Sequence, residues 1–340
     1  MMKNKIITTL KYTFFFALGV FFVWWSIHKM DVNNWQACKA AMQHANFLLF
    51  IPVFFILLLS HISRSIRWKI LMQPMGYQPK LHNTFFAVMI GYLANLAIPR
   101  LGEVLKCTIL AKYEKVPADK LIGTIIVERA VDVISLLIIF IIAIATQANI
   151  ITAYAASTIN KYFLNGPTNS IYFKLLGISI FIALFFIVWK FVIKKFSHIG
   201  IIQKIKSTIL GVKDGLLSVK NLDNKWTFIF HSVLIWCCYI LGTYLGFSAT
   251  AGTSHLAFLT TFPVLAFASI GMIITPGGIG LYQIFVMEVL ILYNIPEPIG
   301  YANGILQWIA QFVIILTLGF ICMLLLPYFN KNKIISTSNL

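Results

Sequence analysis

Seven ionisable residues lie within otherwise apolar segments of this 340-residue chain. They are Arg100, Glu103, Lys106, Glu128, Arg129, Asp132 and Glu288. An ionised side chain in the interior of a bilayer costs roughly 2.5–3.5 kcal/mol, so seven of them facing lipid would cost on the order of 20 kcal/mol. That exceeds the whole folding stability of a typical domain, about 5–15 kcal/mol. We therefore expect these groups to pair with one another or to line a water-filled cavity.

The carboxylates and the basic groups recur at helical spacing. Glu128 and Asp132 are four residues apart and would share one helix face, and Arg129 stands three residues before Asp132. Glu103 and Lys106 would share a face of another helix. These carboxylates can hold neighbouring cations in place or carry protons. The alternative is a buried ion-pair network that only locks helices together.

The segment 276–280 reads Pro-Gly-Gly-Ile-Gly and is a second candidate element for binding an anion. Its glycines are Gly277, Gly278 and Gly280. A helix that starts near Gly280 would present free backbone N–H groups, which favour an anion, although the motif alone is also compatible with a simple turn. The planar guanidinium of Arg100 suits a phosphate, and Lys106 would add a point charge. Together these residues predict a phosphate-bearing headgroup as the ligand.

The composition excludes a soluble enzyme. Hydrophobic residues make up 59% of the chain and charged residues 11%, whereas soluble domains contain about 45–50% and about 25%. The formal charge of +17 indicates basic loops beside anionic lipid rather than binding to nucleic acid. Five cysteines without CxxC spacing and seven scattered histidines indicate neither a disulfide framework nor a metal site. We expect no cofactor, no metal and no catalytic residue.

Apolar runs and basic clusters together predict the membrane topology. The apolar runs are 12–27, 47–59, 85–99, 121–145, 171–192, 226–247, 256–276, 279–295 and 299–326. The basic clusters are 3–11, 64–80 (Arg64, Arg67, Lys69 and Lys80), 112–120, 190–225 and 331–333. The positive-inside rule assigns these clusters to the cytoplasm.

Two of the apolar stretches are predicted to be re-entrant helical hairpins. Because 64–80 and 112–120 are both cytoplasmic, the chain between them must enter and leave on one side, with a tip at 99–103. By the same logic, 255–293 enters from the outside, with its tip at 276–280. The prediction is an all-α polytopic membrane protein with six spanning helices, two hairpins and both termini cytoplasmic. The alternative is eight or more full crossings.

Two further segments have their own character. Residues 12–27 follow three lysines as in a signal peptide, but no small-residue cleavage site follows them, so we expect a retained anchor. In 197–225, aliphatic residues recur every three or four positions among lysines. This pattern predicts an amphipathic helix on the cytoplasmic membrane surface.

The chain also contains an internal duplication. An offset of 179 residues pairs Glu128 with Gln307 and Asp132 with Gln311. Glu128 follows Val116-Pro117 in the first half of the chain, and Gln307 follows Ile295-Pro296 in the second half. The predicted repeat units are 46–147 and 226–327. The charge pattern gives the two units opposite directions, and inverted repeats with broken helices are typical of transporters.

The motifs of this sequence resemble those of the lysylphosphatidylglycerol synthase transmembrane-domain family, also described as flippase-like. The matching segments are Gly91-Tyr92-Leu93-Ala94-Asn95, Pro99-Arg100-Leu101-Gly102-Glu103, Glu128-Arg129 with Asp132, and Pro276-Gly277-Gly278-Ile279-Gly280. The likeness covers roughly residues 10–330. It implies a polytopic inner-membrane protein that moves a lipid between leaflets. In the best-known branch, that lipid is an aminoacylated phosphatidylglycerol made by a fused cytosolic synthase domain.

The chain departs from the family pattern in two ways. Gln283 stands where many relatives carry an acid, and Lys106 where they often carry arginine. The 340 residues also contain no aminoacyl-transferase domain, so we expect no synthesis of lysyl-lipid from them. The residues and the resemblance together predict a substrate-binding set. That set is Asn95, Arg100, Gly102, Glu103, Lys106, Glu128, Arg129, Asp132, Gly277, Gly278, Gly280 and Gln283.

The leading hypothesis is a flippase or scramblase for a phosphate-bearing lipid, which could be a phospholipid, an aminoacyl-phospholipid or an isoprenoid-linked lipid. Its expected partners are membrane lipids with anionic headgroups, and a second copy of the chain or a lipid-synthesis enzyme is a further candidate. The alternatives are an intramembrane lipid-modifying enzyme and a non-transporting scaffold of lipid biosynthesis. The expected location is the inner cell membrane.

Overall fold

The computed structural model describes residues 21–26, 28, 31–98, 101–159 and 222–331, and this part of the chain is helical. The α-helices are α2 (Val32–Gln43), α3 (Phe50–Met72), α4 (Leu81–Ala97), α5 (Leu101–Glu114), α6 (Ala118–Ile159), α9 (Lys225–Ala249), α10 (Thr261–Ile274), α11 (Leu281–Ile291) and α12 (Glu297–Phe329). Short 3-10 turns are η1 (Phe47–Leu49), η2 (Gln73–Met75), η4 (Phe258–Thr260) and η5 (Pro276–Gly278).

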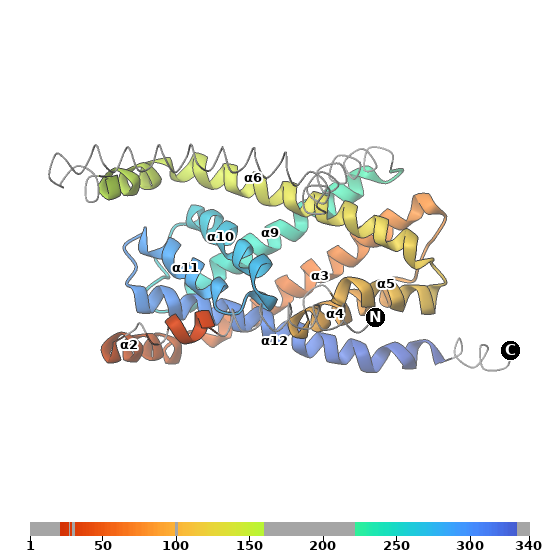
Figure 1. Cartoon of the computed structure of the whole chain (residues 1–340), viewed down its shortest axis with the longest axis horizontal. Helices are drawn as coiled ribbons and strands as arrows, with labels where there is room; N and C mark the ends of the chain where they lie inside the picture. Colours follow the sequence, from red (N-terminus) through yellow and green to blue (C-terminus); the bar gives the residue numbers. More distant parts are fainter. Residues whose placement is uncertain (1–20, 27, 29–30, 99–100, 160–221, 332–340) are drawn as a thin grey trace, which may run out of the picture.

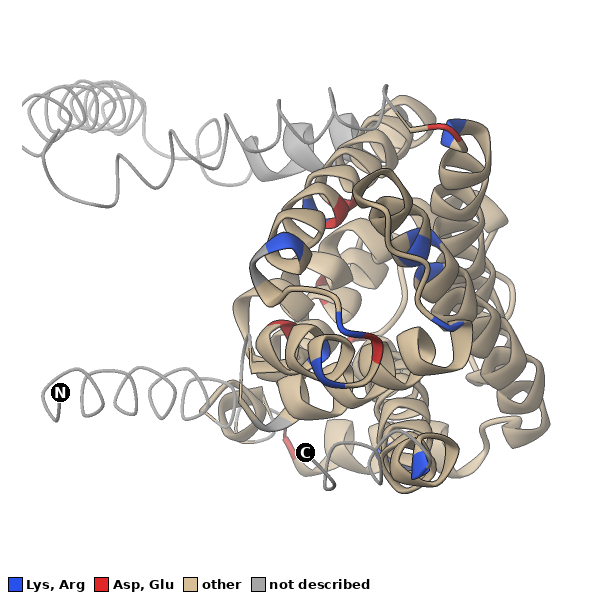
Figure 2. Ribbon diagram, turned by 90° about the vertical axis from the view of Figure 1, so that its right-hand side faces the viewer, with Lys and Arg blue, Asp and Glu red and all other residues tan. Residues whose placement is uncertain are grey.

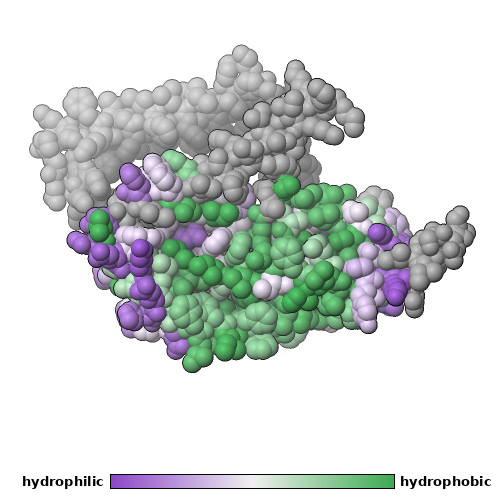
Figure 3. All heavy atoms as spheres, turned by 90° about the horizontal axis from the view of Figure 1, so that it is seen from below, coloured by the Kyte–Doolittle hydropathy of each residue, from purple (hydrophilic) through white to green (hydrophobic). Residues whose placement is uncertain are grey.

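Three of the described helical segments are long and apolar enough to cross a membrane. They are Phe47–Met75, Lys225–Ala249 and Glu297–Phe329. Large apolar side chains on these helices face outward, among them Phe55, Phe230 and Leu324, which are 60–71% exposed. Figure 3 shows the consequence: an apolar band covers the middle of the visible face, and hydrophilic residues lie at the two ends of the long axis. Such a band is the surface of a membrane protein, because soluble proteins rarely expose large apolar patches.

The helices form two similar groups around a central pair (Figure 1). Helices α3 and α9 pack against each other along their lengths. The hairpin of α4 and α5 packs on α3 and α12, and the hairpin of α10 and α11 packs on α9 and α6. Each hairpin therefore contacts the long helix that follows the other hairpin in the sequence.

Helix α3 is longer than its apolar run predicted. The apolar run 47–59 precedes the basic cluster 64–80 in the sequence, but α3 continues to Met72 and carries Arg64 and Arg67 into the protein. These side chains are 6% and 0% exposed, so they lie in the protein interior and not on a basic surface beside the membrane. A helix keeps such groups inside when carboxylates neutralise them, as the site below shows.

Other sequence predictions fall outside the described residues. These are the anchor as far as residue 20, the apolar run 171–192 and the amphipathic segment as far as residue 221. The breaks at the two predicted tips are described at their edges: α4 ends at Ala97 and α5 begins at Leu101, and α10 ends at Ile274 before α11 begins at Leu281.

Candidate functional site

Five ionised side chains from three helices meet in the protein interior, and we call them the ionic cluster. They are Arg64 and Arg67 of α3, Lys106 of α5, and Glu128 and Asp132 of α6. The side chain of Asp132 is 15% exposed and the other four are 7% exposed or less. In the end-on view of Figure 2, basic and acidic positions lie on helices in the middle of the protein as well as at its margin.

Each carboxylate oxygen in the ionic cluster faces a cation. Arg64 Nη1 donates to Glu128 Oε1 at 3.0 Å and to Asp132 Oδ2 at 2.8 Å. Arg67 Nη2 donates to Asp132 Oδ1 at 2.7 Å and lies 3.6 Å from Glu128 Oε1. Lys106 Nζ donates to Glu128 Oε2 at 2.8 Å. Because charge-assisted hydrogen bonds are the strong ones, this network fixes α3, α5 and α6 relative to one another.

Aromatic rings cover the cations of the ionic cluster. The Lys106 ammonium lies 4.6 Å from the centroid of the Trp68 ring, and the Arg64 guanidinium lies 5.9 Å from that of Tyr92. The indole N–H of Trp68 donates to Thr124 Oγ1 at 2.8 Å, which holds the ring in place. A cation over an aromatic face is stabilised by the ring quadrupole. The rings therefore shield these cations from water and still interact with them favourably.

The ionic cluster carries more positive than negative charge. It contains three cations and two carboxylates, and the neighbouring pair of Arg129 and Glu103, with Nε to Oε1 at 3.2 Å, adds no net charge. The Nε atoms of Arg64 and Arg67 are buried and have no hydrogen-bond partner within the described chain. A buried charge is costly unless it is compensated, so this arrangement favours an additional anion.

A small hollow lies beside the ionic cluster, between the α4–α5 hairpin and α6, and we call it the hairpin hollow. It is lined by Val88, Gly91, Tyr92, Asn95, Gly102, Glu103, Lys106 and Arg129. Asn95 Oδ1 accepts the backbone N–H of Gly102 at 2.8 Å, which closes the first hairpin near its tip. The structure therefore brings together five of the residues predicted from the sequence: Asn95, Gly102, Glu103, Lys106 and Arg129.

The tip of the second hairpin meets the end of α4. Gly277, Gly278 and Gly280 have positive φ angles of 59°, 76° and 80°, a region in which side chains other than glycine are strained. A Cβ at Gly277 would lie 3.2 Å from Leu96 Cδ2, close to the tip of the first hairpin. The indole N–H of Trp308 in α12 donates to the carbonyl oxygen of Gly277 at 2.7 Å. Within the described residues, no hydrogen bond or ion pair joins this tip to the ionic cluster.

The remaining predicted residues lie elsewhere. Gln283 is 5% exposed in α11, beside Gly304 of α12, and its Oε1 has no partner within the described part of the chain. Glu288 is exposed on α11 and forms no ion pair among the described residues. Arg100 is outside the described residues. Sequence reasoning missed Arg64 and Arg67, although their spacing of three and the neighbouring Trp68 are compatible with an inward helix face.

The comparisons with known proteins place this chain among membrane proteins. The family described as "Lysylphosphatidylglycerol synthase TM region" matches residues 12–319. The chain belongs to this family. The resemblance read from the sequence motifs is thereby confirmed.

A relative within this family is a UPF0104 membrane protein of Methanocaldococcus jannaschii. It is 25% identical over 285 residues, which cover 81% of this chain and 84% of that protein. No solved structure gives a significant match to the chain. This member of the lysylphosphatidylglycerol synthase transmembrane-region family is therefore a multi-pass membrane protein. Within its described residues, no group of His, Cys, Asp and Glu side chains is arranged to hold a metal ion.

Proposed function

We propose that the protein moves a phosphate-bearing lipid between the leaflets of the cell membrane without changing it chemically, as a transporter of the flippase or scramblase type. The observation that carries this proposal is the uncompensated positive charge of the ionic cluster beside the hairpin hollow. An ion-pair network that served only to lock helices would be most stable when its charges balance. The family name refers to lysylphosphatidylglycerol synthases, which supports a membrane lipid as the ligand.

Phosphate is the anion that this chemistry favours. The Nε donors of Arg64 and Arg67 have no partner among the described residues, and arginine binds phosphate oxygens through its planar array of N–H groups. Lys106 and Arg129 reach the wall of the hairpin hollow, where the only carboxylate among its described lining residues is Glu103. A headgroup phosphate in the hollow would supply the missing negative charge, while the acyl chains stayed in the bilayer.

The proposed topology has six spanning helices and two re-entrant hairpins, with both termini in the cytoplasm. Helix α4 has 17 residues and α11 has 11, so at 1.5 Å per residue they are about 25 Å and about 16 Å long, shorter than a hydrocarbon core of about 30 Å. The contact between Gly277 and Leu96 supports tips that meet inside the membrane. The crossed packing of α4 on α12 and of α10 on α6 supports an inverted repeat of 46–147 and 226–327.

The substitution Lys106→Met tests this proposal. It removes one cation and leaves Glu128 between Arg64 and Arg67, at 3.0 Å and 3.6 Å, so the ionic cluster becomes electroneutral. We expect Tm in detergent to stay within a few degrees of the wild type, because no buried charge is left without a partner. We expect translocation of a labelled phospholipid in proteoliposomes to fall at least tenfold, which corresponds to the roughly 1.4 kcal/mol of one charge-assisted contact.

The matched control is Lys112→Met, which removes a lysine from the exposed end of the same helix. Its transport should equal that of the wild type. If Lys106→Met transports lipid normally, the excess charge has no role in transport. If instead it loses most of its stability, the network is a structural lock and the proposal is wrong.

A further inference from the structure

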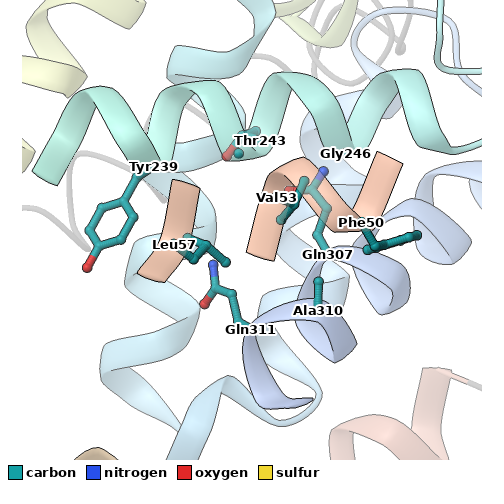
Figure 4. Close-up of a pocket in the computed structure, with 10 residues that line it drawn as sticks. Phe50, Val53, Leu57, Tyr239, Thr243, Gly246, Gln307, Ala310 and Gln311 are labelled. Carbon is teal, nitrogen blue, oxygen red and sulfur yellow. The ribbon is translucent and has the colours of Figure 1, made fainter. Parts of the chain in front are cut away.

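A second polar cavity lies between α3, α9 and α12, and we call it the polar cleft. The space in it that a water-sized group can occupy is about 20 Å³, which is room for roughly one water molecule or one hydroxyl group. It is lined by Phe50, Val53, Leu57, Tyr239, Gly242, Thr243, Gly246, Gln307, Ala310 and Gln311. Figure 4 shows Gln307 and Gln311 extending from α12 toward α3 and α9.

The polar cleft is the counterpart of the ionic cluster in the second repeat. The offset of 179 residues relates Arg64 to Thr243, Arg67 to Gly246, Glu128 to Gln307 and Asp132 to Gln311. All four counterparts line the polar cleft. The packing agrees with this register: Arg67 lies 3.6 Å from Glu128, and a Cβ at Gly246 would lie 2.7 Å from Gln307 Cγ. Four charged residues in the first repeat are therefore replaced by neutral polar or small residues in the second.

The neutral side chains in the polar cleft have hydrogen-bonding capacity left over. The Gln311 amide and the Thr243 hydroxyl form no hydrogen bond with any described residue. Gln307 uses one N–H, in a 2.7 Å bond to Asn303 Oδ1, and its amide nitrogen has a second. The described lining contains no charged residue. An ammonium group would need a carboxylate and a second phosphate would need a cation, whereas hydroxyl groups fit these donors and acceptors.

One tyrosine joins the polar cleft to the ionic cluster. Tyr239 lines the cleft, and its hydroxyl accepts a hydrogen bond from Arg64 Nη2 at 3.3 Å. The side chain of Tyr239 therefore belongs to both places, which makes them neighbours in the structure.

We propose that the polar cleft binds a hydroxyl group from the uncharged part of a lipid headgroup, a polyol or a sugar, whose phosphate lies at the ionic cluster. This inference rests on the proposed function and names its substrate class. It predicts discrimination against headgroups that carry an amine and against a bare phosphate.

Native mass spectrometry of the full-length protein tests the proposal with lipids of matched acyl chains. The probes are phosphatidic acid, phosphatidylethanolamine, phosphatidylglycerol for a polyol and a glycosyl isoprenyl phosphate for a sugar. We expect at least one hydroxyl-bearing probe to bind about fivefold more tightly than phosphatidic acid, the effect of about one net hydrogen bond. Which of the last two binds more tightly identifies the source of the hydroxyl groups.

The substitution Gln311→Leu should abolish this preference and leave the binding of phosphatidic acid unchanged. The control Thr317→Val removes a hydroxyl from the same helix, where it is exposed and bonded to the carbonyl oxygen of Val313 at 2.8 Å, and should keep the preference. If the wild type binds phosphatidic acid as tightly as the hydroxyl-bearing lipids, the cleft does not bind hydroxyl groups. The same conclusion follows if Gln311→Leu weakens the binding of all probes equally. If the wild type binds no phosphate-bearing lipid at all, the proposed function itself fails.

Discussion

Gly102 of α5 lies directly against the backbone of Gly91 in α4, so that a Cβ at position 102 would be 1.8 Å from the carbonyl oxygen of Gly91. No real Cβ approaches a backbone oxygen that closely, and the neighbouring atom is not a flexible side chain that can move aside. The first hairpin therefore requires glycine at this crossing, and the hydrogen bond from Gly102 N–H to Asn95 depends on the same approach.

We expect Gly102→Ala to destabilise the protein by at least about 3 kcal/mol, since overpacking of this kind must separate two helices. The matched control is Gly123→Ala in α6, where an added Cβ meets nothing within 4 Å. Thermal unfolding in detergent should show a lower Tm for the first variant and an unchanged or higher Tm for the second. Equal Tm values would contradict the close crossing of α4 and α5.

The pairing of Glu128 with Lys106 predicts a rescue. Glu128→Gln leaves three cations beside one carboxylate and should cost about 3–5 kcal/mol, as removal of one partner from a buried pair does. In the double variant with Lys106→Met, two cations and Asp132 remain, so we expect at least half of the lost stability to return. A double-mutant cycle on Tm or urea midpoints measures this coupling, and simple additivity of the two changes would refute it.

Much of this arrangement follows from the sequence, because its signals are local. The Pro-Gly-Gly-Ile-Gly run predicts a break, and three glycines with positive φ occupy it. The spacing of Glu128 and Asp132 predicts one helix face, and both carboxylates contact Arg64. In each case the information lies within a few residues.

The partners of those carboxylates could not be predicted in the same way. Arg64 and Arg67 precede Lys69 and Lys80 in the sequence, and a count of basic residues alone assigns all four to one cytoplasmic cluster. The burial of the two arginines depends on Glu128 and Asp132, more than 60 positions later in the chain. Glu288 differs from these arginines in the opposite direction: it lies in an apolar run of the sequence, but its side chain is exposed on the short helix α11.

The pair of Arg129 and Glu103 should contribute much less to stability than the ionic cluster. Their side chains are 44% and 33% exposed, and exposed ion pairs contribute about 0–1 kcal/mol. We expect Arg129→Met to lower stability by less than about 1 kcal/mol, whereas Glu128→Gln, which leaves three buried cations beside one carboxylate, should cost about 3–5 kcal/mol. Chemical unfolding of the two variants side by side gives the comparison. A larger loss for Arg129→Met would mean that the hairpin hollow is closed to solvent.

The hydrogen bond from Trp308 to Gly277 predicts a specific change in the second tip. Trp308→Phe keeps an aromatic ring in contact with Phe312, whose ring centroid lies 5.0 Å from that of Trp308, but removes the N–H donor. We expect a loss of about 1 kcal/mol and faster hydrogen exchange at 276–280, while exchange at the first hairpin is unchanged. Uniformly faster exchange would indicate general destabilisation instead.

The proposed topology predicts which residues a membrane-impermeant maleimide can reach. A Cys237→Ser background removes the exposed native thiol, and the other four cysteines are buried. Of these, Cys38 lies outside the long apolar helices, and burial raises the pKa of its thiol to about 11, so it stays protonated and unreactive near neutral pH.

In this background we expect Ser254→Cys to react in intact spheroplasts, because it precedes the hairpin that enters from outside. Gln78→Cys, on an exposed turn before α4, should react only after the membrane is permeabilised. Ile98→Cys decides between a re-entrant hairpin and two full crossings, since it lies at the end of α4 and is 38% exposed. A re-entrant hairpin keeps this position inside the membrane and unreactive from outside. Labelling of Ile98→Cys in intact spheroplasts would show that α4 crosses completely, and the proposed convergence of two hairpin tips within the bilayer would then be wrong.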